Sequence, residues 1–226
     1  MADINLTTTA VSPTTIDRDD LRTRLRQELH DEDSANYRWT DATLNRHLAR
    51  AVREVGLVLP REQKTGLSTT AGSRDVSAAG LSDLVRIEAV EYPTGQWPPS
   101  FVQFSVFETT LTLLIEEAPA GVQALNVYWG KLHTLDVSTS TLPAVAEDVV
   151  VTGAAAYAAL EWASFATNRA NVAGQDAFEN YKGWGEERLR QFREALRGFG
   201  REARVRNAAL YRPERFSSRN TVQWSS

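Results

Sequence analysis

The chain has 226 residues, of which 42% are hydrophobic and 24% charged, with a formal net charge of −4 and no cysteine. This composition is typical of a soluble globular protein with one domain, or one domain with an elaboration, and it excludes disulfides and thiolate chemistry. No apolar run approaches the roughly 20 residues that span a bilayer, and the N-terminus lacks the pattern of a signal peptide, so we expect folding in a cytoplasm without a membrane partner.

Charge is unevenly distributed along the chain. From Glu186 to Ser226 there are ten Arg, no Lys and five Glu, a balance of +5, so the remaining residues carry −9. An acidic body disfavours tight binding of duplex DNA, because phosphate contacts need clustered Lys and Arg. A basic end either binds an acidic partner surface or is simply a solvated helix end.

The N-terminal segment begins without a regular pattern. Residues 1–15 are rich in Thr, Ala and Ser and show little apolar periodicity, so we expect a flexible arm. A first helix is predicted from about Asp17 to His30, because Leu21, Leu25 and Leu29 recur at helical spacing.

The second predicted helix lies in YRWTDATLNRHLARAVREV, residues 37–55. Thr40 is suited to cap its N-terminus, with Trp39 before the cap and Leu44 after it at the positions of a hydrophobic staple. An apolar stripe that includes Leu44, Leu48 and Val52 should pack against the first helix and the last two helices. The helix should end near Gly56, before Pro60.

From residue 66 to residue 132 the apolar pattern changes to period two, which is typical of strands. The clearest example is LVRIEAVEYP, in which Val85, Ile87 and Ala89 share one side. Other strands are predicted within residues 66–80, 101–107, 110–121 and 122–132. The turn-rich loop YPTGQWPPSF carries Trp97 between two of them.

Helical pattern returns after the strands. One helix is predicted in residues 142–167, with Pro143 in its first turn, and another from about Gln175 past Leu196. The first of these contains a slim run of Gly and Ala from Gly153 to Ala159, which lets another backbone approach closely, either in a neighbouring subunit or, as we favour, within the fold. The last residues show no regular period.

These elements predict an α+β fold. Helices from both chain ends, residues 16–60 and 142–205, form a four-helix core. A small, mostly antiparallel β-sheet block, residues 66–132, is inserted between them, and residues 206–226 form an extended C-terminal tail.

Motifs for catalysis, cofactors or metals are absent from the sequence. The three histidines, His30, His47 and His133, do not have the spacing of metal ligands, and no phosphate-binding, dinucleotide-binding or nucleophile-elbow motif occurs. We therefore predict no catalytic, cofactor-binding or metal-binding residues. The hydroxyls of DVSTSTLP are read as a linker that caps the following helix rather than as nucleophiles.

Tryptophan is frequent, with six residues. Four of them lie in periodic segments and are expected in the core or in subunit contacts: Trp39, Trp129, Trp162 and Trp184. Trp97 and Trp224 lie in loop and tail contexts, where exposed aromatics are either partner anchors or parts of disordered segments.

Several sequence segments, and the order in which they occur, resemble those of one protein family. Residues 37–55 resemble the tryptophan-containing early helix of head-to-tail adaptor proteins of tailed bacteriophages. LVRIEAVEYPTGQWPPSF, and the segment from LTLLIEEAPAG to GAAAYAAL, resemble the sheet block and third helix of one adaptor group. The resemblance runs from about Asp17 to Phe199 and rests on phrases and order, not on catalytic residues.

The resemblance implies a structural virion protein. Such adaptors form a ring, commonly a dodecamer, beneath the portal protein, extend the DNA channel and dock the next neck or tail protein. Double-stranded DNA would pass through the lumen without tight binding, and the protein would reside in the virion neck after assembly in the host cytoplasm. Trp97 is a candidate contact in a loop, and the portal-binding candidates lie in the tail: Arg206, Tyr211, Arg212, Arg215, Phe216, Arg219 and Trp224.

Three alternatives remain open at this point. A neck stopper or tail-completion protein would share the structural role. A small hydrolase would need a convergent His, Asp and Ser set, which the sequence does not suggest. A single-stranded nucleic-acid-binding module would use the aromatics of FVQFSVF for stacking, but the acidic body argues against it.

Overall fold

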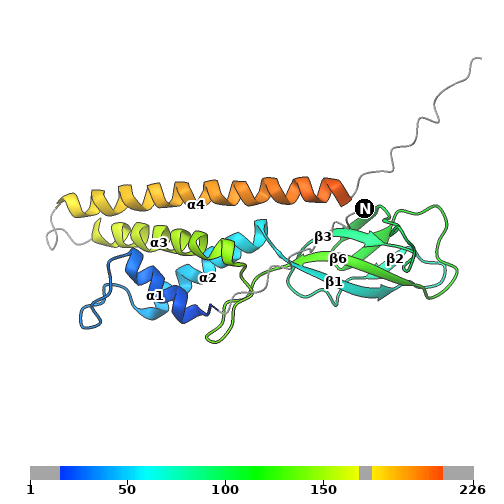
Figure 1. Ribbon diagram of the computed structural model, residues 1–226, viewed down its shortest axis with the longest axis horizontal. Helices are drawn as coiled ribbons and strands as arrows, with labels where there is room; N and C mark the ends of the chain where they lie inside the picture. The colour runs from blue at the N-terminus through cyan, green and yellow to red at the C-terminus, as the bar shows by residue number, and fades with distance from the viewer. Residues whose placement is uncertain (1–15, 168–174, 211–226) are drawn as a thin grey trace, which may run out of the picture. The chain divides into compact units, whose positions relative to one another are not determined.

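The computed structural model describes residues 16–167 and 175–210 (Figure 1). The helices of this part are α1 (Arg18–Glu28), α2 (Asp41–Val58), α3 (Ala144–Thr167) and α4 (Gln175–Leu210). The strands are β1 (Arg61–Ser68), β2 (Asp75–Ser77), β3 (Leu84–Glu91), β4 (Phe104–Phe107), β5 (Thr110–Leu113) and β6 (Ala124–Lys131).

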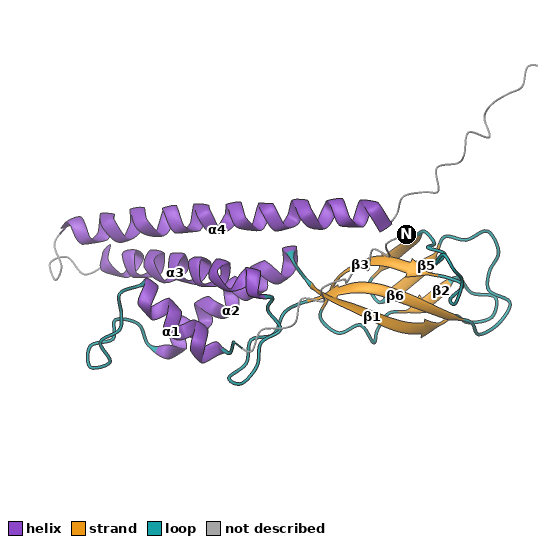
Figure 2. Ribbon diagram, in the orientation of Figure 1, coloured by secondary structure: helices purple, strands orange, loops and turns teal. Residues whose placement is uncertain are grey.

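The chain divides into two compact units. The helical unit contains the described residues of 1–61 and 133–198, and the sheet unit those of 62–132 and 199–226. The six strands of the described chain lie in the sheet unit, apart from Arg61, the first residue of β1 (Figure 2). The predicted α+β class is confirmed, with helices contributed by both chain ends and strands by the middle of the chain.

Local signals start the first two helices as the sequence predicts. The Asp17 side chain caps α1 and forms a reciprocal capping box with Asp20. The Thr40 hydroxyl accepts the Thr43 N–H at the start of α2, at 3.2 Å. α2 continues two residues beyond Gly56 and ends at Val58, two residues before Pro60.

The core of the helical unit is built from α1, α2 and α3, which contact one another pairwise. Leu21, Leu25, Leu44 and Leu48 are fully buried. α3 is apolar around most of its circumference, since five of its alanines have no exposed surface: Ala154, Ala155, Ala156, Ala158 and Ala159. A stretch with no polar side has to be covered on every side, so this middle part of α3 lies at the centre of the unit, while Asp148 near its start and Glu161 near its end are exposed.

α4 packs against the slim part of α3. A Cβ on Gly153 would lie 2.8 Å from the Phe192 ring, and one on Gly185 would lie 3.0 Å from Leu160. Phe192 is fully buried. The predicted role of the Gly and Ala run within the fold is therefore confirmed at Gly153, where absence of a side chain makes room for an aromatic ring.

The sheet unit contains two three-stranded sheets, ordered β1-β6-β3 and β2-β5-β4. β3 pairs with β6, β2 with β5, and β4 with β5, all antiparallel. Both sheets contribute to one core, which contains Val76, Ala78, Leu81, Val90, Leu111, Leu113, Leu125, Val127 and Trp129. The sheets therefore pack face to face as a small sandwich.

Two boundaries differ from the sequence prediction. β1 begins at Arg61, whereas the predicted sheet block began at residue 66, because the side chains of β1 are exposed or half-buried and give no apolar pattern. α4 continues to Leu210, past Arg206, the expected start of the tail. The residues beyond Phe199 lack apolar period but are rich in Ala and Arg, which favour helix.

Candidate interaction surfaces

The predicted contact residues fall into two groups. Arg206 lies in α4, and the other tail candidates, Tyr211, Arg212, Arg215, Phe216, Arg219 and Trp224, lie outside the described residues. The loop candidate, Trp97, is described and has 92% of its surface exposed, the largest fraction among the exposed large hydrophobic residues of the described chain.

The base of the Trp97 loop is closed by the backbone. The Tyr92 N–H donates to the Ser100 carbonyl at 2.9 Å, and the Val102 N–H donates to the Val90 carbonyl at 2.9 Å. Glu91 and Phe101 form an isolated antiparallel bridge between these two contacts. The loop therefore leaves and re-enters the sheet at a fixed point.

A buried carboxylate braces the same loop from beneath. Glu91 is only 6% exposed, and its Oε2 accepts the Tyr128 hydroxyl at 2.8 Å and the Asn126 amide at 2.9 Å. The Gly95 backbone within the loop also donates to this carboxylate. The hydrogen bonds from Asn126 and Tyr128 lower the pKa of Glu91, which therefore stays ionised and keeps its acceptors for these donors.

Side chains packed on Tyr128 complete this support. The Phe101 ring lies edge-on to Tyr128 with centroids 5.9 Å apart, and the Lys64 ammonium lies 4.9 Å from the Tyr128 centroid. Lys64 is also 3.6 Å from the Glu91 carboxylate. Trp97 is thus presented on a held loop, which reduces the ordering entropy that a binding contact would cost.

A second surface lies in the helical unit, where the sequence predicted aromatic residues in the core or in subunit contacts. Arg38 is exposed, and its guanidinium lies 5.1 Å from the Trp162 ring, 5.1 Å from Tyr181 and 5.6 Å from Trp39. Its guanidinium forms no ion pair with any residue in the described part of the chain. Arg38 is therefore a cation held by aromatic faces, and its guanidinium has no hydrogen-bond acceptor among residues 16–167 and 175–210.

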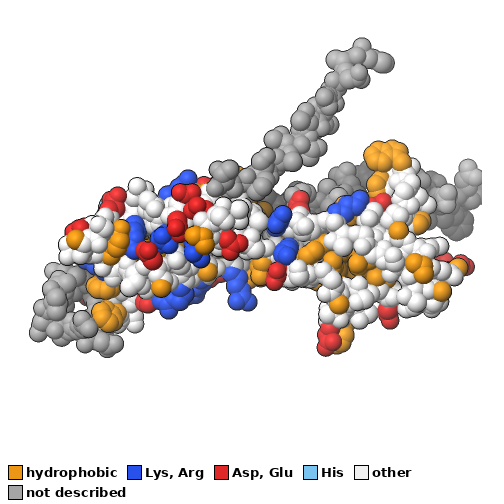
Figure 3. Space-filling view, turned by 90° about the horizontal axis from the view of Figure 1, so that it is seen from below, with side chains coloured by type: hydrophobic (Ala, Val, Ile, Leu, Met, Phe, Trp, Pro, Cys, Tyr) orange, Lys and Arg blue, Asp and Glu red, His pale blue; other side chains and the backbone are white. Residues whose placement is uncertain are grey.

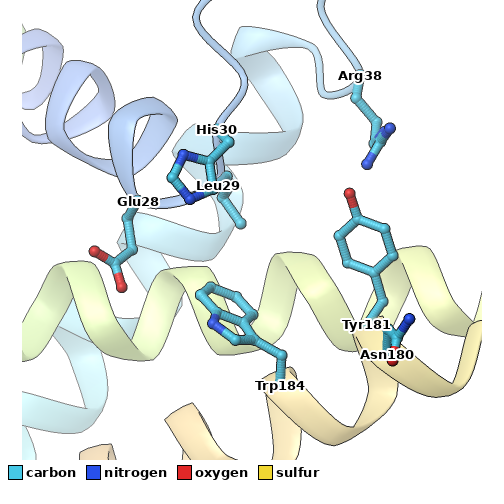
Figure 4. A pocket seen from close by; sticks show the side chains of 7 residues that line it. All are labelled: Glu28, Leu29, His30, Arg38, Asn180, Tyr181 and Trp184. Carbon is cyan, nitrogen blue, oxygen red and sulfur yellow. The ribbon is translucent and has the colours of Figure 1, made fainter. Parts of the chain in front are cut away.

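A pocket of about 410 Å³ lies beside Arg38 in the helical unit. It is lined by Glu28, Leu29, His30, Arg38, Asn180, Tyr181 and Trp184. In Figure 4 the Trp184 indole rises from α4 toward Leu29 and His30, and the Tyr181 hydroxyl points toward Arg38. The pocket thus has an apolar floor with a cation at one side.

The loop that carries Arg38 is fixed by a buried ion pair. Arg26 is 6% exposed and Asp31 7%, and their side chains meet at 2.5 Å. Arg26 also donates to the Trp39 carbonyl at 3.0 Å and to Asp41 at 2.6 Å, while Asp31 accepts the Arg38 N–H at 2.7 Å. A buried pair whose remaining donors and acceptors are satisfied orders the segment from Asp31 to Asp41.

Two of the three histidines, His47 and His133, occupy packing positions, and His30 is exposed. His47 is buried on α2 with its Nε2 2.8 Å from Glu161, and burial lowers its pKa. The Nε2 of His133 lies 2.8 Å from the Leu59 carbonyl, and burial lowers its pKa too. His30 lines the pocket with a φ of 51°. No group of three or more potential metal-ligating side chains occurs in the described residues.

The structure also differs from two predictions about short segments of the sequence, DVSTSTLP and FVQFSVF. The Ser140 hydroxyl accepts the Leu142 N–H and the Thr141 hydroxyl accepts the Thr134 N–H, so these residues bond within the linker instead of capping α3. The phenylalanines of FVQFSVF do not share one exposed face: Phe101 packs on Tyr128, Phe104 packs against the core, and Phe107 is 79% exposed. They do not form a stacking platform.

Surface character differs between the two units. In the view of Figure 3, charged side chains of both signs are interspersed over the helical unit, while the sheet unit shows apolar side chains and few charges. The exposed large hydrophobic residues of the sheet unit are Trp97, Val106, Phe107, Leu114 and Val122. None of the helices in the described residues is long and apolar enough to span a membrane.

Comparison with known proteins gives little. No family model matches the chain, and no curated protein matches it. Among solved structures, the chain is similar to one in a structure titled "Neck of empty GTA particle computed with C6 symmetry". The identity is 15%, the match covers 77% of this chain and 92% of that chain, and the TM-score is 0.30. A score this low does not define a shared fold.

Proposed function

We propose that this protein is a structural subunit of the neck of a tailed bacteriophage particle. It acts as a head-to-tail adaptor, forming a ring beneath the portal protein, extending the DNA channel and docking the next neck or tail protein. The chain carries out no chemistry in this role, and its residues serve shape and contact.

The observation that carries the proposal is the combination of a tightly packed helical unit and a sheet unit that presents a braced, exposed Trp97. The helical unit contains the residues 37–55 that resemble the early adaptor helix, and α3 contains the resembling third-helix segment. A subunit that repeats around a ring needs a rigid body, and the buried α3 supplies one. An exposed Trp on a held loop suits a contact with another protein.

The charge distribution fits the same role. Residues outside the basic C-terminal segment carry a net charge of −9. A channel wall with this balance does not grip DNA that has to slide past it, because non-specific DNA binding depends on cationic side chains.

The second candidate is a neck stopper or tail-completion protein. It shares the sheet-borne contact at Trp97 but does not bind the portal directly. The adaptor is favoured because the resembling segments extend over both units, from about Asp17 to Phe199. Binding to isolated portal separates the two roles.

The test uses the purified full chain and DNA-filled heads that lack a neck. An adaptor should co-sediment with portal-bearing heads and appear as a collar at one vertex by electron microscopy. A stopper should bind only after another neck protein is added. Absence of binding to heads under both conditions would contradict a role in the neck.

Trp97 is tested separately. Trp97→Ala should leave folding and head attachment unchanged and weaken binding of the next neck protein by at least tenfold, as expected for the loss of a hot-spot side chain. Val122→Ala is the matched control, because Val122 is 78% exposed on another loop of the sheet unit. Equal effects of the two variants would argue against an anchor at Trp97.

A further inference from the structure

The β4–β5 hairpin ends in a tip that the proposed function leaves unused. β4 and β5 pair up to Phe107 and Thr110, so the turn consists of Glu108 and Thr109 alone. Phe107 is 79% exposed, and Glu108 is exposed with a φ of 51°. Glu108 has no ion pair within the described part of the chain. The tip thus carries an exposed aromatic ring next in sequence to an exposed carboxylate that has no ion pair among the described residues.

The Arg38 pocket has the complementary character. Its apolar floor, formed by Leu29 and Trp184, gives an aromatic ring a place to be buried. Its edge is the Arg38 guanidinium, which lies over three aromatic rings and lacks a carboxylate partner among the described residues. A guanidinium in that state binds a carboxylate through two parallel hydrogen bonds.

We propose that the Phe107–Glu108 tip of one copy docks in the Arg38 pocket of a neighbouring copy. The Phe107 ring enters the pocket against Trp184 and Leu29, and the Glu108 carboxylate pairs with Arg38. The proposal rests on the ring assembly of the proposed function and identifies the contact between its subunits.

Charge favours the Phe107–Glu108 tip over the C-terminal segment as the part of the chain that binds the Arg38 pocket. The sequence from Arg206 onward carries four Arg and one Glu, so it has the wrong sign for a site whose free group is Arg38. The hairpin tip has a carboxylate next to a ring and lies in a stretch, residues 62–132, with eight acidic and four basic residues. Opposite charges placed this way both attract the correct surface and fix its register.

The geometry of such a contact has a consequence for assembly. The pocket lies in the helical unit and the tip in the sheet unit, so the two contacting surfaces differ. In a ring, each copy would give its tip to one neighbour and its pocket to the other, and such a heterologous contact repeats from copy to copy until the ring closes.

The lack of native cysteine gives a direct test. Thr109→Cys on one preparation and Asn180→Cys on a second, distinguishable preparation place thiols beside the tip and in the pocket. Treatment of the mixture with a short bismaleimide should give a crosslinked heterodimer in at least tenfold excess over the Ala120→Cys and Asn180→Cys control pair. Ala120 is exposed on a different loop of the sheet unit.

Charge reversal then tests the pairing. Arg38→Glu in the pocket preparation, or Glu108→Arg in the tip preparation, should reduce the crosslinked yield at least tenfold, and the two together should restore it. Because Arg38 packs on three aromatic rings, circular dichroism of each variant checks folding, and the milder Arg38→Gln should also reduce the yield. A yield equal to the control, or one that is indifferent to both reversals, overturns the proposal.

Head attachment separates this contact from the proposed function. Loss of crosslinking together with a normal collar on heads would overturn the contact between copies and leave the neck role standing. If Arg38→Glu instead removes head attachment while crosslinking persists, the pocket receives an acidic portal segment and the proposed contact is overturned.

Discussion

Leu48, Phe192 and His133 are three residues of the helical unit whose surroundings predict different behaviour. Leu48 lies in the interior of α2 with no exposed surface. Phe192 fills the space that Gly153 leaves open. His133 lies near the chain's return to the helical unit, where its ring nitrogens bond to Leu59 and Thr141. Each supports a separate measurement.

Leu48→Ala should lower the free energy of unfolding by about 2–5 kcal/mol, because it removes buried methyl groups and leaves a cavity. Leu57→Ala is the control in the same helix, since Leu57 is 51% exposed, and its effect should stay within about 0.5 kcal/mol. Urea unfolding of the three proteins measures both values. Equal stabilities for the two variants would place Leu48 outside the core.

His133 should make stability depend on pH. The Leu59 carbonyl can only accept, so the Nε2 of His133 carries a proton, and Nδ1 lies 3.2 Å from the Thr141 hydroxyl. Burial lowers the pKa of His133 in the folded state. The unfolded chain therefore binds more protons between that lowered pKa and the ordinary value of about 6.5, and stability falls as pH decreases through this window.

The variant His133→Gln isolates this contribution. Burial also lowers the pKa of His47, with the same sign, but His47 is present in both proteins. Urea unfolding at about pH 7.5 and about pH 5.5, on either side of the ordinary histidine pKa, should show a smaller loss of stability for the variant than for the natural chain. An identical loss in both would mean that His133 is not held neutral.

At the scale of elements, the packing of α4 on α3 depends on Gly153, whose missing side chain leaves room for Phe192. Gly153→Ala places a Cβ 2.8 Å from the Phe192 ring and should destabilise the protein by about 1–3 kcal/mol through overpacking. Gly183→Ala, in α4, meets no atom within 4 Å and should stabilise by about 0.5–1 kcal/mol, since Ala favours helix over Gly. Thermal unfolding of both variants provides the comparison. Similar shifts would indicate that Phe192 moves aside freely.

Individual elements also show what the sequence reveals and what it does not. α2 follows from its cap and its stripe because both signals are local. β1 was detected only from Gly66 onward, because its side chains are mostly exposed and its place is set by pairing with β6. The continuation of α4 from Arg206 to Leu210 was not predicted, because the residues beyond Phe199 have no apolar period and only their helix propensity favours it.

For the two candidate surfaces, too, the sequence reveals local features but not the contacts that form only in the folded chain. Exposure of Trp97 follows from its turn-rich loop, but the brace beneath it depends on Glu91 meeting Asn126 and Tyr128 across paired strands. The Arg38 pocket joins residues 28–38 to residues 180–184, which only the folded helical unit brings together. A run of Tyr, Arg and Trp at residues 37–39 was the one local signal for it.

For the whole molecule, the central prediction concerns attachment. Removal of residues 211–226, with the cut placed after the end of α4, should leave the melting temperature unchanged and abolish co-sedimentation with portal-bearing heads. The removed segment carries Arg212, Arg215 and Arg219 with three aromatic residues. Anchors of this kind contribute roughly 1–4 kcal/mol each, and repetition around a ring adds avidity.

A substitution control separates charge from length. Replacing those three arginines by Gln keeps the segment and its aromatic residues, and it should weaken head attachment to an extent that decreases with added salt. Full attachment of the truncated protein would show that the helical and sheet units make the portal contact themselves.

The return of the chain to the helical unit after the strands also sets an order of events during synthesis. Eighty-six positions separate the end of α2 at Val58 from the start of α3 at Ala144, so at 5–20 residues per second α2 waits roughly 4–17 s for its main partner. During that interval the leucine faces of α1 and α2 are uncovered, while the sheet unit already has every strand of its own core. Early folding of the strands would bring Leu59 and His133 together and shorten the loop that α3 has to close. The nascent chain should accordingly gain protease resistance in residues 62–132 before it gains any in α1 and α2.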